Sequence, residues 1–213
     1  MNFHCYIQQE QSVTIQWGCL FFITIKPGKM KATKQLKEEH EGIKIMLSVM
    51  EKIAGNLEKG EELNRDHFTG ILGFLKGFTD QCHHGKEEGH LFPAMVERGI
   101  PELGGPVGVM LHEHRLGREY VAAMSSAFDQ WKEGDPSAAG RIVSTVRSYV
   151  ELLRNHIEKE NNILFNMADQ ALDEQEQLQM AGDFEKLEQD EIGPGKHEEY
   201  HRFLKEMKET YLT

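Results

Sequence analysis

The chain has 213 residues, of which 39% are hydrophobic and 28% are charged, and its formal net charge is −11. This composition is typical of a globular domain with a sizeable core. The acidic balance argues against a nucleic-acid-binding protein, because binding phosphates requires a basic face. No apolar run approaches the ~20 residues of a membrane span, so we expect no contact with a membrane.

Residues 1–29 differ in character from the rest of the chain. Val13 to Ile25 is rich in β-branched and aromatic residues and ends at Pro27-Gly28, a pattern that predicts a strand or hairpin. A disordered segment is the alternative, and in either case we interpret residues 1–29 as an extension of a domain that covers residues 30–213. The odd number of cysteines (Cys5, Cys19 and Cys82) and the lack of a secretory signal predict a cytoplasmic protein.

The first helix is predicted over residues 33–57. Its apolar series Leu36, Ile43, Leu47 and Met50 keeps helical spacing, and His40 occupies a position within that series. His40 is therefore expected to point into the core. A single buried histidine is usually satisfied by a hydrogen bond, so His40 alone would not indicate a ligand.

The second helix is predicted over residues 64–97, with Asn64 as its N-cap. His84 and Glu88 lie four residues apart and share one face. The apolar residues upstream do not share that face; they are Phe68, Ile71, Leu72, Leu75 and Phe78. Either the helix changes partner midway, or a π-bulge shifts its phase. His83 and Glu87 thus remain alternatives, although the downstream apolar residues Leu91 and Met95 favour His84 and Glu88.

The third helix is predicted from about residue 107 to about residue 132. His114 lies on its apolar stripe, which comprises Val107, Met110, Val121, Met124 and Phe128. His112 does not share this stripe.

The fourth helix is predicted to begin at Asp135 as N-cap and Pro136 as first residue. Its stripe is Ile142, Val146, Tyr149, Leu153, His156, Glu160, Ile163 and Met167. Burying two ionisable residues in this seam without a partner would cost several kcal/mol. A bound metal explains both residues.

Two more helices are predicted between about residues 171 and 212, separated by Gly193-Pro194-Gly195. His197 and His201 lie four residues apart on the last of them. They are either surface residues, or one of them closes over the open end of a bundle and completes a metal site.

A His-x-x-x-Glu pair on each of two helices, with single histidines on the first and third, resembles the hemerythrin HHE cation-binding family. The similarity runs from about Met30 to Thr213 and includes the run from Cys82 to Glu88. It implies an all-α, antiparallel four-helix bundle (about 33–168) with additional C-terminal helices around a non-haem di-iron centre. It also implies ligands at these positions: terminal imidazoles from His40, His84, His114 and His156, and bridging carboxylates from Glu88 and Glu160.

One departure from the family pattern concerns the third helix. Oxygen-carrying hemerythrins have a second histidine one turn before the ligand, where this chain has Met110. The first metal thus lacks one nitrogen unless His83 or His201 supplies it. This departure favours sensing, iron handling or redox defence over reversible oxygen carriage.

The donor set of imidazoles and carboxylates suits iron, and also manganese or zinc. We expect two iron ions and a protein that binds or senses O₂ or NO. The alternatives are a redox enzyme or repair factor acting on peroxide, NO or damaged iron–sulfur clusters, and a structural bundle with a polar network. A conventional enzyme is not expected, because no Ser-His-Asp arrangement, phosphate loop or Cys-x-x-Cys motif is present.

Overall fold

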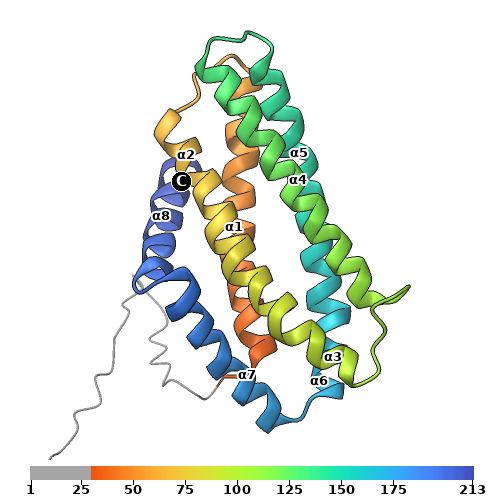
Figure 1. Ribbon diagram of the computed structural model, residues 1–213. Helices are drawn as coiled ribbons and strands as arrows, with labels where there is room; N and C mark the ends of the chain where they lie inside the picture. Colours follow the sequence, from red (N-terminus) through yellow and green to blue (C-terminus); the bar gives the residue numbers. More distant parts are fainter. Residues whose placement is uncertain (1–29) are drawn as a thin grey trace, which may run out of the picture.

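Four helical columns form an antiparallel bundle in the computed structural model, which describes residues 30–213 (Figure 1). The strand or hairpin predicted within residues 1–29 lies outside the described residues. The first and third columns are α1 (Ala32–Glu58) and α4 (Pro106–Lys132). The second joins α2 (Arg65–Phe74), η1 (Leu75–His84), η2 (Glu87–Leu91) and α3 (Phe92–Glu97). The fourth joins α5 (Ala138–Lys159), η3 (Glu160–Leu164) and α6 (Phe165–Ala171).

The predicted all-α bundle with additional C-terminal helices is confirmed. Loops at residues 59–64, 98–105 and 133–137 join successive columns, so neighbouring columns run in opposite directions (Figure 1). The first column packs against the fourth, which closes the bundle. None of the described helices is both long and apolar enough to cross a membrane.

The starts of two helices were predicted from capping residues, with different outcomes. The Asn64 side chain accepts hydrogen bonds from the backbone N–H groups of Asp66 and His67, as expected of an N-cap. The prediction for Asp135 is wrong, because the N-cap of α5 is Ser137. The Asp135 carboxylate instead accepts hydrogen bonds from the backbone N–H and hydroxyl of Ser137, which closes a turn before the helix begins.

Segments of π-helix change which residues face the interior. A π-turn holds more residues than an α-turn, so each such segment rotates the following residues relative to an α-helical phase. In the second column, η1 and η2 bring both the upstream Phe78 and the downstream His83, His84 and Glu87 into the core. In the fourth column the predicted stripe is wrong at Ile163, because η3 leaves this residue 56% exposed and buries Leu164 in its place. Met167, the last residue of the stripe, is partly buried.

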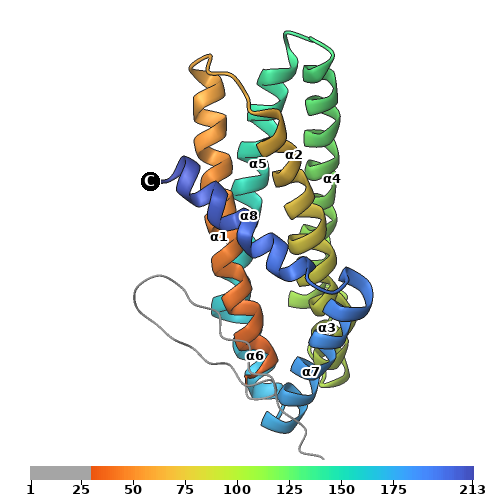
Figure 2. The same ribbon diagram turned by 90° about the vertical axis from the view of Figure 1, so that its left-hand side faces the viewer.

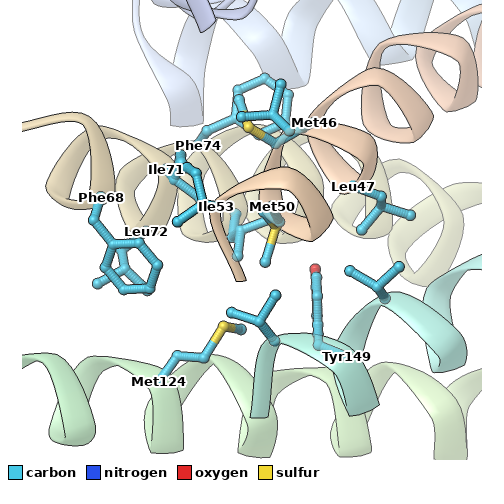
Figure 3. Packing of buried hydrophobic residues seen from close by; sticks show 14 of the residues in the cluster. Met46, Leu47, Met50, Ile53, Phe68, Ile71, Leu72, Phe74, Met124 and Tyr149 are labelled. Atoms are coloured by element: carbon cyan, nitrogen blue, oxygen red, sulfur yellow. The ribbon is translucent and has the colours of Figure 1, made fainter. Parts of the chain in front are cut away.

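Two separate apolar cores fill the bundle. The larger one surrounds Met50, Phe74 and Tyr149, and Figure 3 shows how these side chains meet between the helices. The smaller one surrounds Leu36, Phe92 and other residues at the opposite end. Between the two cores lies a layer of buried histidine and glutamate side chains.

A C-terminal segment covers one side of the bundle. It consists of α7 (Glu174–Leu187), η4 (Glu188–Ile192) and α8 (Lys196–Tyr211). Figure 2 shows α8 crossing obliquely over α1 and the second column. The approach is closest at two glycines, because a β-carbon at Gly70 would overlap the Phe203 ring and one at Gly77 would overlap the Tyr200 hydroxyl.

We expect the substitution Gly77→Ala to lower the free energy of unfolding by about 1–3 kcal/mol, since the added methyl group must displace Tyr200. Gly73→Ala is the matched control, because a β-carbon there meets no atom within 4 Å. The control should be neutral or stabilising by up to about 1 kcal/mol, through higher helix propensity. Urea unfolding of both variants checks this, and equal stabilities would show that α8 does not pack at Gly77.

Candidate metal centre

The layer between the two cores contains seven candidate ligands from all four columns. Each column contributes at least one, at the height where its apolar series is interrupted. The residues are His40 of α1, His83 and His84 of η1, Glu87 of η2, His114 of α4, His156 of α5 and Glu160 of η3. All seven side chains are buried.

These residues form two adjacent groups of potential ligands. One group contains His84, Glu87, His114 and His156, and the other contains His40, His83, Glu87 and Glu160. Within each group, one ligand atom per residue lies within 4.8 Å of all the others. Glu87 belongs to both groups, and Glu160 also approaches both, since its Oε1 lies 4.0 Å from His114 Nε2. Two carboxylates thus lie between the two groups of potential ligands.

Most inward atoms of this layer lack hydrogen-bond partners among the described residues, and the exception is the 3.1 Å contact between His114 Nε2 and His156 Nε2. The atoms without partners include His40 Nε2, His83 Nε2, His84 Nε2 and both carboxylate oxygens of Glu87 and of Glu160. His40 Nε2 and His156 Nε2 each lie 3.2 Å from Glu160 Oε2. Buried polar atoms without partners are rare in folded proteins. A set of lone pairs converging on two points fits bound metal cations.

The outer nitrogen of each histidine is held by an oxygen atom from another side chain. The Nδ1 pairs are His40–Asn161 (2.9 Å), His83–Glu39 (2.8 Å), His84–Asp80 (3.2 Å), His114–Glu88 (2.6 Å) and His156–Glu113 (3.0 Å). Oxygen acceptors at Nδ1 favour the tautomer with its proton on Nδ1 and its lone pair on Nε2. The five rings are thus oriented with Nε2 toward the centre.

Basic side chains surround the carboxylates among these acceptors. The Arg118 guanidinium donates to both Asp80 (2.8 Å) and Glu88 (2.8 Å). The ammonium groups of Lys159 and Lys86 pair with Glu113 and Glu39, respectively. Every carboxylate that holds a ring is therefore itself paired with a basic side chain.

Charge within the centre is balanced by close pairs. Burial opposes the charged form of His156, but Glu160 and Glu113 outweigh it and raise the pKa of His156 to about 10. Burial would likewise raise the pKa of Glu160, but His156 and His40 hold it well below its usual value. Burial and the nearby His114 lower the pKa of His84 well below its usual value. The Glu160 carboxylate is thus anionic and able to neutralise a cation.

Five of the six residues predicted as ligands lie in the two groups: His40, His84, His114, His156 and Glu160. The sixth, Glu88, lies outside both groups, because its carboxylate accepts hydrogen bonds from His114 Nδ1 and Arg118. Glu87 occupies the shared position, as the π-helical phase of this column requires. The structure also places His83 in a group, whereas His201 lies against Phe78 and His197.

Several residues that hold the rings were not identified from the sequence. The Glu39 carboxylate holds His83, whereas that of Glu158 accepts a hydrogen bond from Asn162. Asp80 precedes His84 by one helical turn, and this spacing could have identified it. The contacts of Glu113 and Asn161 cross between columns and leave no mark in local spacing.

A cavity of about 340 Å³ leads toward the centre between the second column and α4. Its lining includes the predicted ligand His84, and Asp80 and Arg118, which form an ion pair. Gly117 and Ala122 line it from α4. The cavity therefore reaches the side chain of one member of the metal groups.

Comparisons with known proteins agree with this geometry. Residues 31–168 match the family model described as hemerythrin HHE cation binding domain. The iron-sulfur cluster repair protein DnrN of Neisseria gonorrhoeae is 29% identical over 121 residues, which cover 54% of this chain and 76% of that protein. The iron-sulfur cluster repair protein YtfE of Dickeya chrysanthemi (strain Ech1591) is 32% identical over 123 residues, which cover 52% of this chain and 53% of that protein.

Proposed function

Because the chain belongs to the hemerythrin HHE cation binding domain family, we propose that its buried layer holds two iron ions and binds O₂ or NO. The observation that carries this proposal is the set of inward lone pairs and carboxylate oxygens without hydrogen-bond partners. Such a set is costly in a metal-free core and favourable around cations. A purely structural polar network would be expected to satisfy these atoms by pairing them.

Iron is proposed because imidazole and carboxylate together suit iron, with manganese and zinc as alternatives. Inward-facing histidines and glutamates from different helices are how helical bundles hold paired metal ions. Five imidazole nitrogens and four carboxylate oxygens fill fewer positions than two six-coordinate ions offer. Bound iron would supply the redox-active position at which a diatomic ligand is held.

The chain's own residues control access to that position. The two apolar cores exclude water from both sides of the layer, which limits displacement of a bound ligand by water. The acceptors at Nδ1 orient the rings before any ion arrives, so little rearrangement is needed on binding. Small ligands are proposed to enter through the cavity that ends at His84.

Repair of iron–sulfur clusters is a second candidate function, favoured by the names of the two relatives. In this role the centre would release iron to a damaged cluster rather than retain a gas. Reactivation of an oxidised iron–sulfur protein by the iron-loaded chain, with matching loss of its own iron, would favour repair. A centre that keeps its iron in that assay would favour ligand binding.

The deciding experiment is anaerobic reconstitution with ferrous iron, followed by metal analysis and optical spectra before and after O₂ or NO. We expect two irons per chain and a new charge-transfer band on exposure to at least one gas. Metal content near zero would overturn the proposal. Bound iron without a spectral response to either gas would favour the repair function.

We expect Ala122→Trp to slow association of NO or O₂ with the iron-loaded protein, because the indole would fill the cavity. The iron content should stay unchanged, since Ala122 belongs to neither metal group. Ala123→Trp on the same exposed stretch of α4, outside the cavity lining, is the matched control. Stopped-flow rates that are equal for both variants would show that ligands enter elsewhere.

A further inference from the structure

Lys86 is a fully buried cation next to Glu87, which belongs to both metal groups. The Lys86 side chain is 0% exposed. The ammonium donates hydrogen bonds to Glu39 and, over 2.5 Å, to Glu188. A lysine is almost never fully buried unless it is paired in this way.

The contacts of Lys86 continue to a proposed ligand. One oxygen of Glu39 accepts from Lys86, and the other accepts from His83 Nδ1 over 2.8 Å. His83 Nε2 faces the centre as a member of one metal group. A continuous series of contacts therefore runs from Glu188 through Lys86 and Glu39 to His83.

This series begins outside the region that matches the family. The match ends at residue 168, and Glu188 is the first residue of η4 in the C-terminal segment. The segment packs against α1, and η4 lies against η1. The C-terminal segment thus supplies a charge to the surroundings of the metal centre.

Lys86 differs in its exposure from Arg118 and Lys159, the other basic side chains that pair with the ring-holding carboxylates. The side chains of Arg118 and Lys159 are 40% and 37% exposed, so solvent and salt screen their charges. Lys86 has no such screening, and a charge in a buried environment acts more strongly at a given distance. Among these three cations, Lys86 should have the largest influence on the metal centre.

The surroundings of Lys86 could also suggest another metal position, since ligand atoms of Glu39, Glu188 and His197 lie within 4.8 Å of one another. The Lys86 ammonium, however, already donates to both carboxylates. The Lys86 ammonium therefore supplies the positive charge at this third group, and we assign no metal position there.

We propose that Lys86 is a positioning residue that raises the reduction potential of the metal ion held by His83, and that Glu188 of the C-terminal segment offsets part of its charge. A buried positive charge opposes the higher oxidation state of a nearby ion. It also weakens the attraction of Glu39 for the His83 proton, which makes the ring a poorer donor. The inference rests on the proposed iron centre.

The test is a spectroelectrochemical titration of the full-length iron-loaded protein and three variants, with melting temperatures measured in parallel. Lys86→Met should lower the midpoint potential. Lys159→Met is the matched control, because Lys159 stands in the same relation to Glu113 and His156 but is exposed, and its shift should be smaller. Glu188→Gln should raise the potential, because it removes a negative charge and leaves Lys86 to neutralise Glu39 alone.

Opposite shifts for Lys86→Met and Glu188→Gln support the proposal, since general loosening of the structure would move both in one direction. A Lys86→Met shift no larger than that of Lys159→Met would overturn it. If Lys86→Met does not fold, Glu188→Gln decides, and an unchanged or lowered potential is the contrary result. Wild-type protein that binds no iron would overturn both proposals. If the wild type binds iron but its midpoint potential equals those of the variants, only the proposal for Lys86 is overturned.

Discussion

Glu87→Gln is expected to lose most of the bound metal, while Glu88→Gln keeps most of it. Glu87 is buried and has ligand atoms in both groups, so the substitution removes an anionic donor from each cation position. Glu88 acts only through His114 and Arg118. Loss of a partner of that kind typically costs about 10–100-fold in metal affinity, which a tight site tolerates.

The adjacent pair makes a controlled comparison, because both substitutions are isosteric and remove one negative charge. The measurement is metal per chain after dialysis against a weak chelator, with circular dichroism to verify helical content. The reverse result, with metal lost only from Glu88→Gln, would mean that the second column keeps an α-helical phase and that η1 and η2 do not place Glu87 inside.

Removal of the metal is expected to produce the largest change in stability. A ligand that binds only the folded state stabilises it by about 4 kcal/mol when its free concentration is 1,000 times its dissociation constant. Two buried ions that join all four columns should therefore raise the melting temperature markedly. His114→Ala should abolish most of this gain, whereas His112→Ala should retain it, because the His112 ring lies outside both groups and pairs with Arg115.

Differential scanning calorimetry with and without metal measures this gain for the wild type and both variants. An unchanged melting temperature on chelation of wild-type protein would contradict the prediction. It would favour a bundle in which the histidines and glutamates serve only as a polar network.

The gain from metal should also increase with pH. In the metal-free protein the pKa of His156 is raised from 6.5 to about 10, so its charged form stabilises the fold fully below pH 6.5. That contribution is lost as the pH rises through about 10, and metal binding must displace the same proton. The difference in melting temperature between loaded and metal-free protein should widen between these two pKa values, and a constant difference would contradict this assignment.

Much of the fold followed from simple periodicity. The series around His40 and His114 has regular α-helical spacing, and both residues lie where that spacing placed them. The Asn64 cap was also identified from the local sequence. These features depend on contacts within a few residues, which a sequence displays directly.

The remaining features depend on π-helix or on distant contacts. The choice between Glu87 and Glu88 depends on η1 and η2, and the exposure of Ile163 depends on η3. A period of 3.6 residues cannot place these residues correctly. The contact between Lys86 and Glu188 joins residues 102 positions apart, and no local pattern indicates it.

The two apolar cores at the ends of the bundle and the polar layer between them place different constraints on the sequence. Each end has its own packed interior, which can accept different aliphatic and aromatic side chains if their total volume is kept. The middle layer has no such freedom, because each proposed ligand there must place its donor atoms at fixed positions. Sequence variation should therefore be tolerated at both ends of this protein and excluded from a thin slab at its centre.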